Sequence, residues 1–557
     1  MKFAWKDRYS LCLASVGLSL AFATSALSRE PQGKLAPSLS ASVASGKRTR
    51  VIIVMAAPEQ GGQADVFHSP ANYLRSVLKG STAREIQAVV GTPYVIAVVN
   101  RKGLSRLERD RNVVRLYRDL KVAPLPFGAK QLRGIQSTNP MEVKNGSAAV
   151  AVLDSGVDRT LPALKGHIVA EACFSSTSAS EHSQSLCRDE REQINSAAGT
   201  PCTRGDRCSH GTQVAEIIAG TAGSNASDLP AAGIVSVQIF SEFSGTSKKD
   251  RDNPCRPNAQ TCMNAWSSDI LRAMLYVEEL SRTVTIAAVN LSVGSGRYKD
   301  RCDAYSPLND VMGRLLAKGI AVVAAAGDDH FGDAINFPAC NSNALAVGAT
   351  RTDGEIDVRH SNMAKQLAFV APGVETGTAP QLGKAKPAST SAAAPHIAGA
   401  IAVLRAKYPD VGLDKLQDIM KSTGTKITDP RNHREFVRPN AQAALAALGG
   451  DMKPAATAPE TACEAICVEI GPTTKRVILA LAKNRQPIGR DVLVALQEVF
   501  GQTAKIANIG DGKILVLLPD GLLKEHVDKA LKLFPNDLRI LPDQRMQPLQ
   551  PSGLNDL

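Results

Sequence analysis

The stretch AAVAVLDSG (148–156) is an almost unbroken apolar run that ends in an acidic residue and a glycine. Three later runs have the same form: IAAVNLS (286–292), IAVVAAAG (320–327) and ALAVGAT (344–350). Helical stretches lie between or after these runs, at TQVAEIIAG (212–220), SDILRAMLYVEELS (268–281), DVMGRLLAKG (310–319) and SAAAPHIAGAIAVLRAKYP (391–409). Strands buried on both faces of a parallel sheet have this continuous apolar character. The pattern therefore predicts an α/β fold in which helices cover both faces of a parallel sheet, with active-site residues gathered at the carboxyl ends of the strands.

Two smaller segments predict a different architecture. Residues 47–122 have the order β-α-β-β-α-β, and residues 463–557 repeat that order. Each is therefore predicted to be a small α+β module that flanks the main domain. The C-terminal module carries no pattern that indicates chemistry, and we expect it to serve as a compact interaction or stability module of unknown role.

The first 28 residues (1–28) have the features of an export signal. Lys2, Lys6 and Arg8 precede the apolar stretch LCLASVGLSLAFA (11–23), which is too short to span a bilayer comfortably. An uncleaved anchor is the alternative, but we expect an exported protein, periplasmic or extracellular, without a stable membrane anchor. The remaining predicted segments are a linker (29–46), a connector (123–146), the main domain (147–448) and a second linker (449–462).

The cysteines agree with export. Of the 11 cysteines, Cys12 lies in the expected signal, which leaves an even number. An even number in an exported chain indicates disulfides, although spacing alone does not fix their connectivity. The absence of a CxxC pair makes a zinc site the weaker interpretation. Short spacings suggest Cys202–Cys208, Cys255–Cys262 and Cys463–Cys467, with Cys173–Cys187 and Cys302–Cys340 left over.

The net charge of +12 raises the question of a nucleic-acid partner. The basic surplus lies almost entirely in the first quarter of the chain, and the residues from 134 onward are close to neutral. Electrostatic binding of nucleic acid needs a concentrated basic surface on the mature protein. We therefore expect no nucleic-acid partner if the N-terminal quarter is removed.

Three short motifs stand in one order within the predicted α/β region. They are VLDSGVD (152–158), HGTQVAEIIAG (210–220) and STSAAAPHIAGA (389–400). Taken singly, Asp154 and Ser391 would be helix caps and His210 an exposed histidine. Taken together, they supply a hydroxyl nucleophile, an imidazole base and a carboxylate that orients the imidazole. Nucleophilic acyl transfer needs this combination.

These motifs resemble those of the subtilisin-like (subtilase) serine peptidases. The order Asp, His, Ser and the words D-S-G, H-G-T-x-V-A and T-S-x-A-x-P-H-x-A-G match over about residues 147–448. The resemblance implies the subtilisin fold and a serine endopeptidase that acts on peptide or protein substrates. It assigns Ser391 as nucleophile, His210 as general base and then acid, and Asp154 as the orienting carboxylate. No cofactor is required for this chemistry. Family members often bind structural calcium, but the acidic residues are too scattered to assign ligands, so no metal-binding residue is predicted.

The basic N-terminal module (47–122) resembles the family's propeptide, which is an intramolecular chaperone and inhibitor with the same element order. This implies a zymogen that cleaves itself between residues 120 and 146 and is inhibited by its own propeptide. The segment NLSVGSG (290–296) matches the family's N-x-S-x-G. It implies that Ser292, Val293 and Gly294 pair with the substrate backbone as an added strand.

The stretch AAAG (324–327) matches the wall of the pocket that takes the side chain before the scissile bond. Ala325, Ala326 and Gly327 are small, which implies an apolar or broad preference. The next residue departs from the family, because Asp328 stands where relatives have an Asn that donates a hydrogen bond to the oxyanion. Losing such a donor costs roughly 10²–10³ in rate.

Three explanations for Asp328 compete. The carboxyl is protonated in an enclosed site and donates, as at least one active branch of the proprotein convertases with Asp here suggests by resemblance. Alternatively, the backbone N–H of Ser391 suffices, or Asp329 or another donor has moved in. The first explanation predicts an acid-shifted pH optimum. Ser389 is a second departure, because relatives have Gly there and the added side chain is expected to crowd the backbone or the substrate path.

Three functional hypotheses follow from these observations. The leading one is an exported, self-processing serine endopeptidase. The alternative is a catalytically weak or silent subtilase scaffold that acts as a binding protein, which only Asp328 and Ser389 support. A third hypothesis is an envelope-binding protein whose main functional part is the module at 463–557.

Overall fold

The computed structural model describes most of the chain up to residue 451 and the strands of the C-terminal region. The described ranges are 33–39, 47–56, 70–126, 147–192, 194, 197–204, 207–221, 231–245, 255, 259–351, 353–373, 388–451, 476–481, 505–510, 513–517 and 538–541. The chain divides into two compact units, Met1–Lys453 and Pro454–Leu557. The expected export signal lies outside the described residues.

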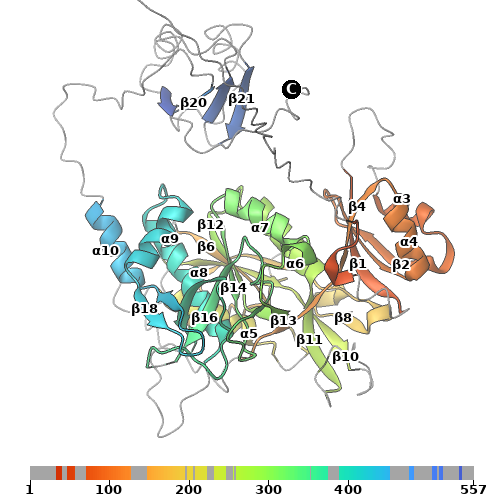
Figure 1. The fold of residues 1–557 in the computed structure, drawn as a ribbon, viewed down its shortest axis with the longest axis horizontal. Helices are drawn as coiled ribbons and strands as arrows, with labels where there is room; N and C mark the ends of the chain where they lie inside the picture. Colours follow the sequence, from red (N-terminus) through yellow and green to blue (C-terminus); the bar gives the residue numbers. More distant parts are fainter. Residues whose placement is uncertain are drawn as a thin grey trace, which may run out of the picture. The chain divides into compact units, whose positions relative to one another are not determined.

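A seven-stranded sheet forms the centre of the first unit (Figure 1). Its pairs are all parallel, as the apolar runs predict. The order across the sheet is β17 (Leu367–Pro372), β16 (Leu345–Thr350), β14 (Ala321–Ala325), β12 (Ile286–Leu291), β6 (Ala149–Asp154), β9 (Gly233–Gln238) and β7 (Ile168–Cys173). The predicted α/β fold class is confirmed.

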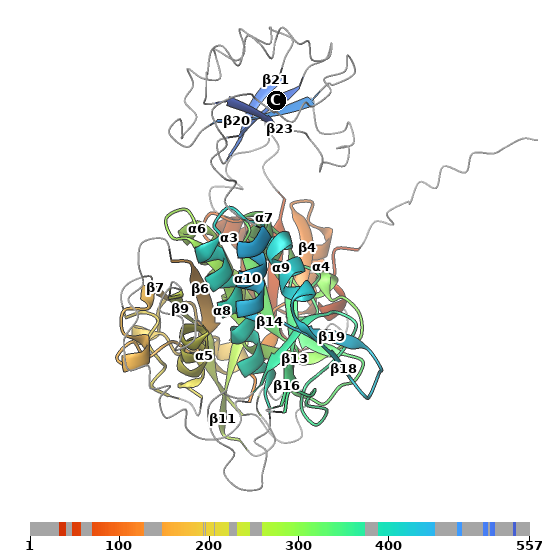
Figure 2. The same ribbon diagram turned by 90° about the vertical axis from the view of Figure 1, so that its left-hand side faces the viewer.

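Helices cover both faces of this sheet, and successive residues of β6 show how the core is divided. Ala149, Ala151 and Leu153 join the apolar cluster that contains α6 (Ser267–Leu280) and α7 (Leu308–Ala317). Val150 and Val152 join the cluster that contains α5 (His210–Gly220) and α8 (Thr390–Lys407) (Figure 2). The second cluster also takes in α9 (Leu413–Ser422) and α10 (Ala441–Asp451). A strand buried on both faces has no polar face, which explains its continuous apolar run.

A second sheet is built partly from the N-terminal part of the chain. Its order is β15 (Ile335–Phe337), β13 (Val293–Tyr298), β5 (Lys121–Pro124), β11 (Thr261–Trp266), β10 (Phe240–Ser244) and β8 (Ser183–Ser185). Strand β5 is antiparallel to both of its neighbours. It follows directly on the small N-terminal module and joins that module to the α/β region.

The N-terminal module has the predicted element order. Its strands form an antiparallel sheet in the order β2-β3-β1-β4. A separate apolar cluster that includes Ile53, Leu74 and Leu107 fills it. The elements are β1 (Thr49–Met55), α3 (Pro70–Val77), β2 (Ala83–Ala88), β3 (Tyr94–Val99), α4 (Arg101–Arg109) and β4 (Val113–Arg118).

The C-terminal unit contains an antiparallel sheet. Its described strands are β20 (Arg476–Leu481), β21 (Lys505–Gly510), β22 (Lys513–Leu517) and β23 (Leu538–Leu541), in the order β21-β22-β20-β23. All four strands match predicted ones. The two helices expected in this unit lie outside the described residues.

Four disulfides close loops of the first unit. They are Cys173–Cys187, Cys202–Cys208, Cys255–Cys262 and Cys302–Cys340. The two suggested short pairs and the two left-over pairs are confirmed, whereas Cys463–Cys467 lies outside the described residues. In the part of the chain that the structure describes, no helix is both long enough and apolar enough to cross a membrane.

Close packing of α8 gives a prediction for stability. A Cβ at Gly399 would lie 2.6 Å from Oγ1 of Thr221, next to α5, so Gly399→Val overpacks the interface between the two helices. We expect a loss of about 1–3 kcal/mol in the free energy of unfolding. The measurement is chemical denaturation in a Ser391→Ala background, which removes the nucleophile that the resemblance assigns.

The matched control for this prediction is Gly332→Ala. A Cβ at Gly332 meets nothing nearer than Cβ of Arg431 at 3.5 Å, an ordinary contact distance. Equal stability of the two variants would show that α8 and α5 are not packed as described.

Candidate active site

The three residues of the predicted triad lie at the ends of three elements. Asp154 is the last residue of β6, His210 is the first residue of α5, and Ser391 is the second residue of α8. All three are buried, and His210 is only 3% exposed. The close approach of α5 to the strand end needs a residue without a side chain after the histidine. A Cβ at Gly211 would lie 2.5 Å from the carbonyl oxygen of Gly156.

The structure brings these side chains into one hydrogen-bonded row. Nδ1 of His210 lies 2.7 Å from Oδ1 of Asp154, and Nε2 lies 3.2 Å from Oγ of Ser391. The backbone N–H of Ser155 also donates to Oδ1 of Asp154, at 2.7 Å, which fixes the carboxylate. A carboxylate that accepts from Nδ1 leaves Nε2 as the nitrogen that faces the hydroxyl. The row therefore has the connectivity that general-base activation of Ser391 requires.

Leu125, just beyond β5, reaches this row from the N-terminal side of the chain. Its carbonyl oxygen lies 2.9 Å from Nε2 of His210 and 3.4 Å from Oγ of Ser391. A carbonyl oxygen can only accept hydrogen bonds, and the Leu125 oxygen lies within reach of both catalytic side chains. The carbonyl oxygen of Ser292, at 3.2 Å, is a further acceptor for the Ser391 hydroxyl. The site is thus occupied by the protein's own chain.

The residues expected to pair with substrate backbone pair with this segment. Val293 and Gly294 of β13 are in register with Pro124 and Ala123 of β5. The backbone N–H of Leu125 points to the carbonyl oxygen of Ser292, at 3.4 Å. On its other edge β5 pairs with β11. Residues 121–125, which we call the cleft strand, therefore lie as a middle strand between β13 and β11.

The expected pocket residues lie at and just after the end of β14. The side chain of Leu125 is 6% exposed and belongs to the same apolar cluster as Ala325, whereas Ala326 faces the opposite cluster. Gly327 has a φ of +107°, and a Cβ there would lie 1.9 Å from Oδ1 of Asn336. Only glycine fits this position, because both the backbone conformation and the space exclude a side chain.

Asp328 lies beneath the N-terminus of α8, where both carboxylate oxygens accept hydrogen bonds. Oδ1 accepts from the backbone N–H and the hydroxyl of Thr390, at 2.8 and 2.9 Å, and Oδ2 accepts from the Ser389 hydroxyl, at 2.7 Å. Burial raises the pKa of Asp328 to about 6, although these three hydrogen bonds oppose the rise. The carboxyl group anchors the turn that carries Ser391.

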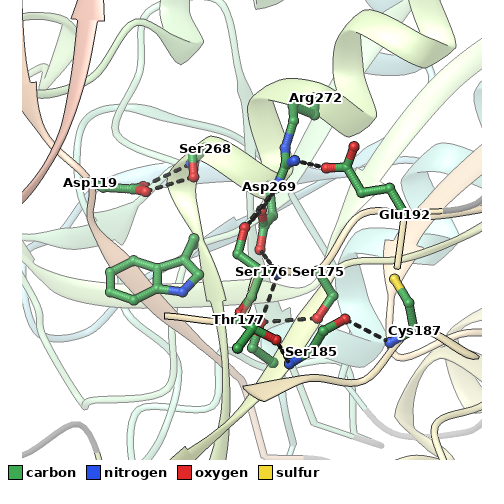
Figure 3. Close-up of polar contacts among 12 residues, drawn as sticks. Asp119, Ser175, Ser176, Thr177, Ser185, Cys187, Glu192, Ser268, Asp269 and Arg272 are labelled. Atoms are coloured by element: carbon green, nitrogen blue, oxygen red, sulfur yellow. Dashed lines mark hydrogen bonds and ion pairs between the residues drawn. The ribbon is translucent and has the colours of Figure 1, made fainter. Parts of the chain in front are cut away.

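A buried polar network that the sequence analysis missed holds the N-terminal module on the α/β region. Asp119 accepts from the backbone N–H and the hydroxyl of Ser268, at 2.8 and 2.6 Å, at the start of α6 (Figure 3). Arg50 of β1 donates to Asp119 at 2.8 Å and to Ser176 at 3.1 Å. The partial positive charge of the N-terminus of α6 favours the carboxylate of Asp119.

Further charged groups continue this network inside the α/β region. Ser176 donates from its hydroxyl and its backbone N–H to Asp269, at 2.7 and 2.9 Å, and Asp269 pairs with Arg272, which also contacts Glu192 (Figure 3). The available signal in the sequence was Asp119 itself, an acid that follows Arg115 and Arg118 two residues before the cleft strand. Within the described residues, no group of three or more His, Cys, Asp or Glu side chains converges as a metal site would require.

Comparisons with known proteins agree with this geometry. Residues 145–438 match the model of the subtilase family. Three similar proteins are the thermostable alkaline protease of Halalkalibacterium halodurans, subtilisin DY of Bacillus licheniformis and subtilisin Savinase of Lederbergia lenta. The first is 25% identical over 61% of this chain and 79% of its own length. The second is 28% identical over 30% of this chain and 60% of its own length. The third is 34% identical over 25% of this chain and 49% of its own length. The matched part thus spans from about half to about four fifths of these relatives.

Among solved structures, fervidolysin from Fervidobacterium pennivorans aligns with 79% of this chain and 66% of its own chain, at 15% identity and a TM-score of 0.47. A protease from Pseudoalteromonas arctica aligns with 56% of this chain and 96% of its own, at 20% identity and a TM-score of 0.39. The family match covers more than half of the 557 residues. The chain belongs to the subtilase family, the subtilisin-like serine endopeptidases.

Proposed function

We propose that this protein is an exported, self-processing serine endopeptidase whose N-terminal module inhibits it until processing is complete. The observation that carries the proposal is the position of Leu125. Its carbonyl oxygen lies within 3.4 Å of both the candidate base and the candidate nucleophile. The cleft strand pairs on both edges as a peptide substrate would.

In the proposed mechanism, Oγ of Ser391 attacks the carbonyl carbon of the bound peptide while Nε2 of His210 takes the hydroxyl proton. Asp154 holds Nδ1 of His210 and stabilises the resulting cation. The imidazolium then gives its proton to the leaving amine, and an acyl-enzyme remains on Ser391. Water, activated by His210, hydrolyses that ester and returns the enzyme. Leu125 is buried and belongs to the same apolar cluster as Ala325, which supports a preference for an apolar residue on the acyl side of the cleaved bond.

The first substrate is the chain itself. The bond that the cleft strand presents is Leu125–Pro126, and Pro126 is exposed. Cleavage there leaves a module that ends at Leu125, and its strand stays paired in the cleft as a product inhibitor. Export is supported by the apolar stretch within residues 1–28 and by four disulfides, which persist in oxidising compartments.

The proposal is tested by the intact masses of wild type and Ser391→Ala, both exported and purified at neutral and mildly acidic pH. Wild type is expected to lose the residues up to Leu125 and to begin at Pro126 or later in the connector, whereas the variant keeps the module. A module that is absent from both proteins would assign the cleavage to another protease.

Asp119 gives a second prediction, because it joins the module to α6 through buried hydrogen bonds. Asp119→Ala leaves Arg50 buried without this carboxylate and is expected to weaken the hold of the cleaved module by about 3 kcal/mol. The cleaved module should then separate from the processed enzyme during gel filtration, and peptide hydrolysis should appear sooner after processing.

The matched control is Glu108→Ala, which removes an exposed acid from α4 of the same module. The control should behave as wild type. Equal retention of the module in all three proteins would contradict a role for Asp119 in inhibition.

One observation favours the alternative of a weakly active scaffold. The backbone N–H of Ser391 donates to the hydroxyl of Ser389, at 3.1 Å. That N–H is the donor on which the oxyanion would depend. If both wild type and Ser391→Ala keep the module at either pH, the scaffold becomes the better account.

A further inference from the structure

The hydroxyl of Ser389 has an unusual position for the first residue of the nucleophile's turn. Ser389 is the N-cap of α8 and is 3% exposed. Its Oγ accepts the backbone N–H of Ser391 at 3.1 Å and donates to Oδ2 of Asp328 at 2.7 Å. One oxygen atom therefore bridges the nucleophile's own N–H and the carboxyl group of residue 328.

These two partners are the groups between which an oxyanion is expected. Acyl transfer needs donors 2.7–3.1 Å from the oxygen that becomes negative. The N–H of Ser391 is one, and the residue in position 328 supplies the other in relatives, by the resemblance described above. The carbonyl oxygen of Leu125 instead lies 2.9 Å from Nε2 of His210. The Ser389 oxygen lies between these two groups, and the carbonyl oxygen of Leu125 does not.

We propose that the Ser389 hydroxyl fills the oxyanion site in the resting state and must turn away before each acyl transfer. Ser389 is then a positioning residue that sets the rate of the chemical step. The inference rests on the proposed peptidase function, since an oxyanion forms only if Ser391 attacks a carbonyl.

Asp328 holds the hydroxyl in place. A hydrogen bond from a hydroxyl to a carboxylate is about twice as strong as one between neutral groups. Burial raises the pKa of Asp328 to about 6, and the nearby Asp329 adds to the rise. Ionised Asp328 therefore keeps Ser389 in the site above about pH 6, and below that pH the neutral carboxyl group releases the hydroxyl more easily. His210 and Asp154 are the other titratable groups at the nucleophile.

Two conditions must be met to open the site. Ser389→Gly removes the hydroxyl, and the φ of −126° at this residue suits glycine or any other residue. At neutral pH it leaves the carboxylate of Asp328 facing the oxyanion. Asp328→Asn removes that charge but leaves the hydroxyl in the site. Only the double variant both empties the site and supplies an amide donor.

The test is steady-state hydrolysis of a peptide with the sequence of residues 121–125, Lys-Val-Ala-Pro-Leu, linked to a fluorescent amine. The full-length proteins are wild type, Ser389→Gly, Ser389→Ala, Asp328→Asn and the double variant Ser389→Gly/Asp328→Asn. Rates are expressed per active site titrated with a fluorophosphonate, so that differences in processing cancel. Ser391→Ala gives the background.

At pH 7.5 each single variant should stay within about threefold of wild type in kcat. The double variant should exceed wild type by about a hundredfold, which is more than the product of the two single effects. At pH 5.5 Ser389→Gly and Ser389→Ala alone should raise kcat about tenfold. These factors correspond to one hydrogen bond to a charged group gained or lost. KM should change little, because the substrate backbone pairs with β13 and β11. A peptide boronic acid ending in Leu should bind more tightly in proportion to kcat.

If Ser389 acts only as a helix cap, Ser389→Ala should be less stable, while its kcat and the pH profile of kcat stay unchanged. This result would overturn the inference. A fall in kcat of tenfold or more in Ser389→Ala at both pH values would overturn it too, since the hydroxyl would then be a donor in the transition state. If no variant reacts with the fluorophosphonate or exceeds the Ser391→Ala background, the proposed peptidase function fails, and the inference falls with it.

Discussion

The pairing of the cleft strand on both edges is the constraint on which the described site depends. In the described second sheet, strands β13 and β11 each pair with β5, which lies between them. An edge strand with unpaired backbone groups binds an extended peptide readily. Two such edges facing one another fix both the position and the register of the strand between them. Leu125 lies at the triad because Ala123 is opposite Gly294.

The same arrangement explains why the N-terminal module and the α/β region form one compact unit. The backbone pairs of the cleft strand carry no sequence information, whereas the Arg50–Asp119 pair and the start of α6 are specific contacts directly before it. The four residues of β5 therefore act together with a buried ionic anchor. Removing one partner of a buried pair costs several kcal/mol, so the anchor determines how firmly the module would be held after the proposed cleavage.

The N-terminus of α8 combines two requirements that oppose each other. The turn must hold Ser391 rigidly, and the polar groups of Asp328, Ser389 and Thr390 do so with four hydrogen bonds. The proposed chemistry also requires that the N–H of Ser391 be free for the oxyanion. In the arrangement described, the turn is held by hydrogen bonds, but one of them uses the N–H of Ser391. Asp328 and Ser389, the two departures from the family pattern, are joined by a hydrogen bond and therefore form one unit.

The sequence predicted the sheet, the two small modules and four disulfides, because continuous apolar runs, element order and short spacings are local signals. It also predicted that Asp154, His210 and Ser391 would meet, since each lies at a strand or helix end next to small residues. The position of Leu125 at the triad could not be predicted from the sequence, because strand pairing between residues 124 and 293 depends on the folded module. The Arg50–Asp119 contact and the bridge made by Ser389 were also not predictable, since both depend on side-chain directions in a buried space.

The most direct test of the account is hydrogen–deuterium exchange of full-length Ser391→Ala, followed by mass spectrometry of the peptide that covers residues 119–126. If this segment is a middle strand, its amides should exchange at least about a hundredfold more slowly than those of the free peptide with the same sequence, because they open only with the module or the sheet. Exchange as fast as in the free peptide would show that the cleft is empty in solution, and would contradict the strand pairing from which the inhibition and the position of Leu125 are argued.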